Sequence, residues 1–184
     1  MKNRQTDKPS KRTAKWRREL RDWGVSLSVA VVSALLIQNF AFAQTEVRNV
    51  SMQSTLYEGQ RLIEDKITYR FGHPNRGDIV IIQGPESEQR LIKRVIGLPG
   101  DVVDMKDGQV YVNGNRLEEP YARGATYSKG LALPYAVPDD KLFVMGDNRE
   151  HSTDSRELGP IALSSVEGRA VFRIWPPHTF GGLQ

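Results

Sequence analysis

Two polar side chains of this 184-residue chain could form a hydrolytic pair, the hydroxyl of Ser51 and the amine of Lys93. A serine hydroxyl is a weak nucleophile until a neighbouring base removes its proton. The chain has no cysteine, so thiol catalysis, disulfides and thiolate metal sites are excluded. A lysine can act as the base when burial keeps its amine neutral. Lys93 suits this role because Leu91, Ile92, Val95 and Ile96 around it predict a largely buried strand.

A histidine base is the alternative, and the chain has three histidines, at positions 73, 151 and 178. Their flanking residues give no HExxH or other helical metal-ligand spacing, so we predict no metal site and no cofactor. A Ser-His-Asp arrangement with His151 and Asp154 is possible. His151, however, lies in a charged loop that we expect to be exposed.

A third stretch, residues 146–156, follows an apolar strand and is dense in short polar side chains, which is typical of a turn-rich loop. The hydroxyl of Ser152 could hold the lysine amine and orient it toward Ser51. Asp147 and Asp154 could also simply pin loops together through ion pairs with arginine, the candidates being Arg94, Arg149 and Arg156.

Three segments must position these residues. Residues 1–23 hold nine Lys/Arg against three acids, which indicates a basic tail. Residues 24–43 are twenty residues without a charge, about 30 Å of helix, which predicts one transmembrane anchor. The positive-inside rule keeps the tail cytoplasmic and sends residues 44–184 to the outer side. Alternatively, Ala41-Phe42-Ala43 resembles a signal-peptide cleavage site, and the mature protein would then be soluble.

Residues 44–184 have the length of one domain and nearly balanced charge, 17 Lys/Arg against 19 Asp/Glu. The basic character therefore belongs to the tail, which would meet anionic lipid, and no nucleic-acid partner is indicated. We expect a mainly β, antiparallel domain. Asp107-Gly108 and Asn113-Gly114 predict two tight hairpins, and apolar runs predict strands at 78–83, 90–96, 141–145 and 169–175. Segment 118–140, rich in Pro and Gly, should be an extended surface excursion.

Four motifs together resemble the successive boxes of the bacterial type I signal peptidases. They are Ser-Met-x-x-Thr-Leu from Ser51, Arg-Gly-Asp-Ile-Val at 76–80, Lys-Arg-Val-Ile-Gly-Leu-Pro-Gly-Asp at 93–101 and Gly-Asp-Asn-Arg-x-x-Ser-x-Asp-Ser-Arg at 146–156. Their order and spacing match from about Ala43 to the C-terminus. The last two boxes are long and specific.

The resemblance implies a Ser-Lys endopeptidase that removes signal peptides from exported preproteins after a small-x-small motif. By position, Ser51 would be the nucleophile, Lys93 the general base and Ser152 the residue that holds the amine, while Asp147, Asp154, Arg94 and Arg156 would hold the loops of the site. The implied fold is an antiparallel β domain with a small β region inserted at about 102–140. We expect a monomer in the cell or thylakoid membrane.

The resemblance also implies an oxyanion site and substrate pockets. The backbone N–H of Ser51 would be one oxyanion donor, and the Asn49 amide would replace the hydroxyl that the family often has there. Small-residue pockets would be lined by Val47, Met52, Leu56, Leu91 and Ile92, which as isolated residues are typical of an ordinary core. Ser54 occupies the position of a usual family proline, so the turn that presents the nucleophile loses a restraint.

Two competing hypotheses remain. A catalytically impaired relative could serve as a membrane-bound binding or assembly module, which the departures at Asn49 and Ser54 would favour. A self-cleaving Ser-Lys repressor shares the chemistry, but it would need an N-terminal DNA-binding motif where this chain has a tail and an anchor. The Ala-Phe-Ala sequence further predicts self-processing after Ala43.

Overall fold

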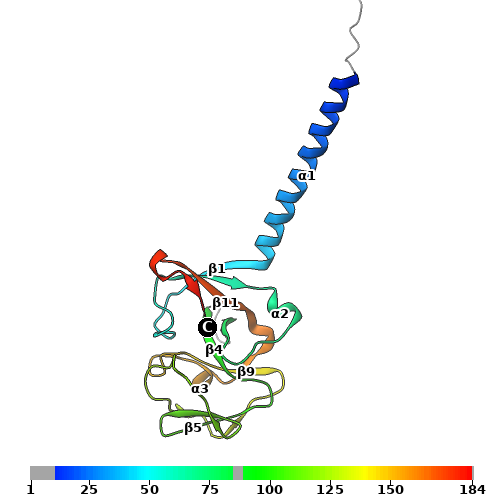
Figure 1. Cartoon of the computed structure of the whole chain (residues 1–184). Coiled ribbons are helices and arrows are strands. Elements are labelled where there is room, and N and C mark those ends of the chain that lie inside the picture. The colour runs from blue at the N-terminus through cyan, green and yellow to red at the C-terminus, as the bar shows by residue number, and fades with distance from the viewer. Residues whose placement is uncertain (1–10, 85–88, 184) are drawn as a thin grey trace, which may run out of the picture. The chain divides into compact units, whose positions relative to one another are not determined.

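The computed structural model describes residues 11–84 and 89–183, without the side chains of 11–14, 17 and 36–39 (Figure 1). The chain divides into two compact units, Met1–Phe40 and Ala41–Gln184. The first contains the long helix α1 (Lys11–Ala41). Among the described residues, no helix meets the length and apolarity that crossing a bilayer requires. The predicted span 24–43 includes residues 36–39, whose side chains lie outside the described set.

The second unit is built on an eight-stranded antiparallel sheet with the order β1-β2-β11-β3-β4-β9-β10, to which β12 adds by pairing with β11. Strands β3 and β4 lie near its middle and are largely buried, with four consecutive buried residues in β3 and six in β4. The bounds are β1 (Phe42–Glu46), β2 (Arg61–Asp65), β3 (Ile79–Gln83), β4 (Arg90–Gly97), β9 (Lys141–Met145), β10 (Ile161–Ala162), β11 (Val166–Trp175) and β12 (Gly181–Gly182).

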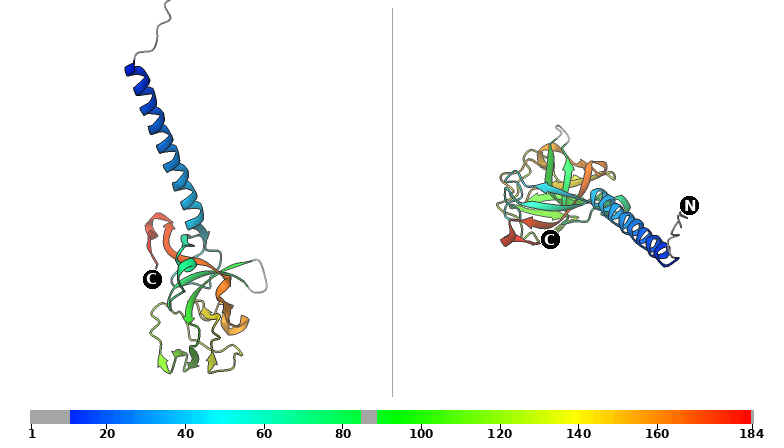
Figure 2. Two further views of the ribbon diagram at one scale, coloured as in Figure 1. Left: turned by 90° about the vertical axis from the view of Figure 1, so that its right-hand side faces the viewer. Right: turned by 90° about the horizontal axis from the view of Figure 1, so that it is seen from above.

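A smaller four-stranded antiparallel sheet is inserted between β4 and β9, in the order β7-β6-β5-β8. Its strands are β5 (Val102–Lys106), β6 (Gln109–Val112), β7 (Asn115–Arg116) and β8 (Tyr135–Ala136). Asp107-Gly108 and Asn113-Gly114 form the two hairpin turns, and all four residues have positive φ. Figures 1 and 2 show this sheet, in green, at the end of the domain opposite the red C-terminal segment.

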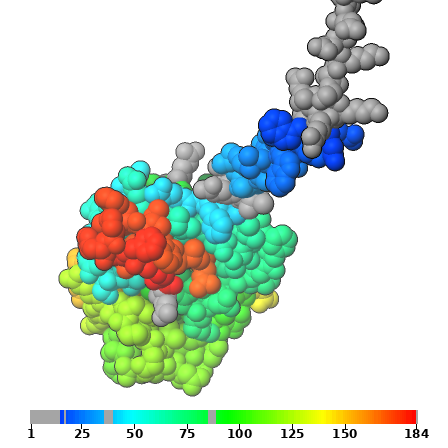
Figure 3. Space-filling model, turned by 45° about the horizontal axis from the view of Figure 1, so that its top comes forward, coloured from blue at the N-terminus to red at the C-terminus, as the bar shows by residue number. Residues whose placement is uncertain are grey.

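Short helical turns complete the domain: α2 (Thr68–Phe71), α3 (Ser155–Leu158), and the 3₁₀ turns η1 (Leu163–Ser165) and η2 (Pro177–Thr179). In Figure 3 the C-terminal residues form a raised red surface beside the cyan segment that opens the domain. The pairings β1 with β2, β2 with β11 and β11 with β12 explain this neighbourhood.

Apolar side chains pack in three clusters that hold the strands around β4. One cluster joins Met52 and Leu56, from the turn after β1, to Ile92 of β4. A second contains Val95 of β4 with β3 and β9 residues, and the third contains Ile96 with the small sheet. β4 therefore contributes a side chain to all three clusters.

The prediction of a mainly β, antiparallel domain is confirmed, and the strands predicted at 78–83, 90–96, 141–145 and 169–175 correspond to β3, β4, β9 and β11. The small sheet falls within the expected 102–140 insert. Helix α1 ends at Ala41, and Phe42 and Ala43, the last residues of the expected anchor, lie in β1 opposite Asp65 and Glu64.

Candidate active site

The Lys93 amine and the Ser51 hydroxyl are in direct contact, with Nζ 2.8 Å from Oγ. The two residues are 42 positions apart in sequence and come from different segments, the middle of β4 and the turn after β1. Both are buried, with 2% of Lys93 and 5% of Ser51 exposed. The residues that the sequence singled out as a nucleophile and a base are therefore within proton-transfer distance.

Burial lowers the pKa of Lys93 to about 8, because the apolar surroundings disfavour the charged ammonium. The negative charges of Asp154 and Asp147 raise the pKa of Lys93, and the positive charge of Arg156 lowers it. The loss of hydration outweighs the acidic neighbours. An appreciable fraction of the amine is therefore neutral slightly above neutral pH, and a neutral amine can accept the proton of the hydroxyl.

The turn that carries Ser51 is fixed by its own backbone and by the core. Gln53 N donates to Val50 O, and the amides of Thr55 and Leu56 donate to Met52 O. Met52 and Leu56 are fully buried beside Val47 in the core. These three residues anchor the turn, and none of them lines the groove described below. Their predicted role as pocket residues stays a prediction. Complete burial of these apolar side chains stabilises the folded turn more than partial burial would.

Asn49 accepts hydrogen bonds instead of donating them. Its Oδ1 lies 2.8 Å from Ser51 Oγ and 3.2 Å from Ser51 N. An asparagine side chain readily bonds the backbone amide two residues ahead, and this local Asx turn is the physical reason for the orientation. In this conformation the side-chain oxygen of Asn49, and not its amide nitrogen, faces Ser51 and engages the Ser51 N–H. The predicted oxyanion roles of Asn49 and of the Ser51 N–H stay predictions.

Two arginine-carboxylate pairs support the predicted loop residues. The Arg94 guanidinium donates twice to Asp147, at 2.9 and 2.8 Å, and Thr55 Oγ1 donates to the same carboxylate at 2.5 Å. Arg156 donates twice to Asp154, each time at 2.8 Å. All four charged side chains are buried. Each pair is bidentate, the geometry that fixes orientation best.

The pair with Arg156 keeps the carboxylate of Asp154 ionised. Burial favours its neutral form, but the hydrogen bonds and charge of Arg156, with the Gly146 amide, lower the pKa of Asp154 below its ordinary value. Gly146 N donates to Asp154 Oδ2 at 3.0 Å. The carboxylate thus remains charged and keeps residues 146–156 folded over the site.

Ser152 is buried in the site, on one side of Gly146. A Cβ on Gly146 would lie 2.3 Å from Ser152 Oγ and 2.4 Å from Ser51 O, so glycine alone allows both to approach. Among the described residues, the Ser152 hydroxyl makes no hydrogen bond of ordinary geometry, although it is close enough to Asp154 to help lower that pKa. Its predicted hold on the Lys93 amine stays a prediction.

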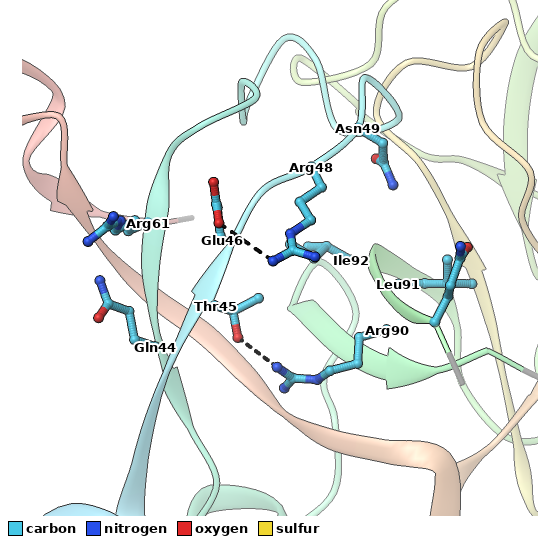
Figure 4. A pocket seen from close by; sticks show the side chains of 10 residues that line it. Gln44, Thr45, Glu46, Arg48, Asn49, Arg61, Arg90, Leu91 and Ile92 are labelled. Carbon is cyan, nitrogen blue, oxygen red and sulfur yellow. Dashed lines mark hydrogen bonds and ion pairs between the residues drawn. The ribbon is translucent and has the colours of Figure 1, made fainter. Parts of the chain in front are cut away.

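A groove of about 840 Å³ lies between β1 and the start of β4 (Figure 4). Leu91 and Ile92 line it, and Asn49 marks the end nearest Ser51. Arg90 reaches across it to Thr45 Oγ1, at 3.2 Å, and its guanidinium also pairs with Glu64 and Glu167. An extended peptide could lie in this groove beside two strands.

Several supporting residues were not predicted. Asn148 N donates to Ser51 O at 3.0 Å, and its side chain donates to Val50 O. Arg149, paired by the sequence with acids of its own loop, instead binds Glu119 of the inserted region. The only sequence signal for these supporting residues was the density of polar residues in 146–156. Their partners are distant in sequence, and such contacts leave no local pattern. His151 is exposed, and no three His, Cys, Asp or Glu side chains of the described residues gather as metal ligands would.

Comparisons with known proteins show which family this chain resembles. The family profile "Signal peptidase, peptidase S26" matches residues 20–175. Signal peptidase I P of Bacillus subtilis subsp. natto is 41% identical over 167 residues, 84% of this chain and 88% of that protein. Signal peptidase I T of Bacillus subtilis strain 168 is 41% identical over 184 residues, 95% and 94% of the two chains. A crystal structure of a signal peptidase I from Enterococcus faecalis V583 has 36% identity and a TM-score of 0.48, and covers 53% of this chain and 97% of its own.

The antiparallel β fold, the buried serine and these relatives define the class of protein, a hydrolase of the serine endopeptidase type. Within that class, the chain belongs to the signal peptidase family, peptidase S26.

Proposed function

We propose that the protein removes N-terminal signal peptides from exported preproteins, cutting after a small-x-small motif, with Ser51 as nucleophile and Lys93 as general base. The observation that carries this proposal is the 2.8 Å contact between a buried hydroxyl and a buried amine whose pKa is lowered to about 8. The names of the relatives support the substrate class.

The chemistry follows from the contact. As Ser51 Oγ bonds to the scissile carbonyl carbon, its proton passes to Lys93 Nζ. The tetrahedral intermediate collapses, the C–N bond breaks, and Nζ gives the proton to the leaving amine. Lys93 then deprotonates a water that hydrolyses the acyl ester and restores the hydroxyl. The Ser152 hydroxyl, buried against Gly146, positions the amine between these transfers.

The oxyanion requires donors at the end of the groove. When a substrate carbonyl enters, it competes with Asn49 Oδ1 for the Ser51 N–H. Rotation of the Asn49 side chain by about half a turn about its terminal torsion would present the amide Nδ2 instead. A fixed donor at an oxyanion is worth about 3 kcal/mol of transition-state stabilisation. Substrate binding therefore assembles the oxyanion site from an Asx turn.

Residues 24–43 would anchor the protein in the membrane with the basic tail on the cytoplasmic side. Helix α1 covers most of this uncharged stretch, and nine Lys/Arg precede it in residues 1–23. Such an anchor would hold the catalytic unit at the surface where preproteins emerge. Alkaline extraction of membranes tests this: the full-length protein should stay in the pellet, and release with the peripheral proteins would contradict it.

The decisive experiment is cleavage of a labelled preprotein with an Ala-x-Ala site in detergent. Wild type should give a product whose new N-terminus follows the second alanine. Ser51→Ala and Lys93→Met should both reduce turnover to background, whereas Ser54→Ala should retain it. Loss of activity in Ser54→Ala with retention in Ser51→Ala would refute the assignment. An inactive wild type that still binds the preprotein would favour the binding-module alternative.

A further inference from the structure

A segment of the inserted region, residues 119–126, lies against the active site, and we name it the strap. Arg123 N donates to Asp147 O at 2.8 Å, and Arg149 N donates to Arg123 O at 2.9 Å. The buried Arg149 side chain also binds Glu119 and Thr126, at the two ends of the strap. These contacts fix the strap to the loop that carries the supporting residues of the site.

The strap brings Arg123 close to Ser51. Asn148 forms a parallel bridge with Arg123, and its amide donates to Ser51 O. Neighbouring hydrogen-bonded segments lie about 4.8 Å apart, so the Arg123 backbone is about 10 Å from Ser51. An extended peptide covers that distance in about three residues.

The strap and the groove lie at opposite ends of the turn that carries Ser51. The groove adjoins Asn49, before Ser51, and no strap residue lines it. The strap contacts the residues after Ser51: Ser54 Oγ donates to Tyr121 O at 2.9 Å, and Arg123 Nη1 donates to Gln53 Oε1 at 3.4 Å. A peptide that fills the groove and presents its scissile bond at Ser51 therefore continues over the strap.

Arg123 offers that peptide an accessible positive charge. The residue is exposed, and among the described residues no carboxylate lies within 4 Å of its guanidinium, whose side-chain partner is the neutral amide of Gln53. The backbone of Arg123 is held on both sides, and its guanidinium forms no ion pair among the described residues, although the Glu150 side chain lies against the neighbouring Gly124. The charge is thus positioned by the fold and available to a ligand.

We propose that Arg123 is a specificity residue for the mature side of the cut. It favours an acidic side chain, and disfavours a basic one, at the second or third residue after the scissile bond. This inference rests on the proposed function, because it names a preference within the same cleavage. An exposed ion pair contributes up to about 1 kcal/mol, so the preference for acid over base should be about three- to tenfold.

The test uses three preproteins that differ only at the second and third residues after the cut, which are Glu, Gln or Lys. Wild type should cleave the Glu substrate with a three- to tenfold higher kcat/KM than the Lys substrate at about 50 mM salt. The ratio should shrink at about 500 mM salt, because exposed charges are then screened. Arg123→Gln should bring the ratio near one, and Arg123→Glu should invert it.

The matched control is Arg70→Glu, the same charge reversal at an exposed arginine of α2; its ratio should equal that of wild type. Equal losses on all three substrates in Arg123→Glu would show a structural role and overturn the proposal, as would a wild type that does not discriminate. Wild-type cleavage of the Gln substrate tests the proposed function separately. If wild type does not cleave this substrate, the proposed removal of signal peptides is itself contradicted.

Discussion

Replacing Lys93 by methionine should make the folded protein more stable near neutral pH. Methionine keeps the length of the side chain without its charge. Lys93 has a pKa lowered by burial from its ordinary value of 10.5 to about 8. Below pH 8 the amine is protonated in both the folded and the unfolded protein, and the folded state carries the full cost of a buried ammonium.

The size of that cost follows from linkage. The difference between 10.5 and about 8, at about 1.4 kcal/mol for each pKa unit, corresponds to about 3 kcal/mol. The unfolded state binds more protons between these two values, so this contribution to stability improves as the pH rises from about 8 to 10.5. Methionine removes the cost but also one hydrogen bond to Ser51, worth about 1 kcal/mol. The net gain at pH 7 should be about 2 kcal/mol.

Equilibrium urea unfolding of the full chain in nonionic detergent, followed by circular dichroism from pH 6.5 to 10.5, measures this effect. The free energy of unfolding of Lys93→Met should exceed that of wild type by about 2 kcal/mol at pH 7. This difference should decline above pH 8 as Lys93 loses its proton in the folded wild type. The titrations of the other groups are common to both proteins and cancel in the difference. Ser51→Ala is the control, since it keeps the buried amine and hence the pH dependence. A difference that does not vary with pH, or a methionine variant less stable at pH 7, would show that the amine is not desolvated.

Three further predictions follow from the site. Below pH 8, kcat/KM should rise about tenfold per pH unit and then level, because the proposed base is the neutral amine of Lys93; a flat profile from pH 6 to 9 would argue against a lysine base. Gly146→Ala should lower kcat and destabilise the fold by about 1–3 kcal/mol through overpacking, since a Cβ would meet both Ser152 Oγ and Ser51 O; wild-type turnover in that variant would contradict the packing described. Asn49→Ala should reduce kcat by about 10² if the amide completes the oxyanion site, and unchanged turnover would remove that role.

Self-processing after Ala43 remains a prediction, to which the fold adds a condition. Ala43 pairs with Glu64 in strand β1, so the bond to Gln44 lies within a ladder. β1 must detach from β2 before the chain can enter another molecule's groove. Cleavage should therefore be slow and second order in enzyme. N-terminal sequencing after long incubation checks this, and persistence of Met1 alone in active enzyme would count against it.

The sequence predicted the parts of the fold that local patterns encode. Apolar runs bounded by Gly or Pro located β3, β4, β9 and β11, and the Asp-Gly and Asn-Gly pairs located both hairpins. It could not predict where β1 begins, because Phe42 and Ala43 continue an uncharged stretch that is equally compatible with a helix. Pairing with β2, a contact distant in sequence, decides the strand there.

The same division holds at the site. Ser51 and Lys93 were found from residue type and motif, and the structure brings them into contact. Val47, Met52 and Leu56 were assigned to pockets and are each buried in the core; a motif does not tell a lining residue from an anchoring one, so their pocket role stays a prediction. The contact of the strap with the loop 146–149 depends on the tertiary fold and had no local signal.

The surroundings of the buried cations explain why Lys93 suits the role of the proposed base. Within the described residues, four basic side chains of the catalytic unit are buried: Lys93, Arg94, Arg149 and Arg156. Each arginine has a carboxylate partner within 4 Å, whereas Lys93 contacts a hydroxyl instead. A paired carboxylate would favour the charged form and raise the pKa of the amine. Guanidinium groups hold the acids of the site and stay protonated, so the lysine remains the one buried cation among these four that can release its proton and act as a base.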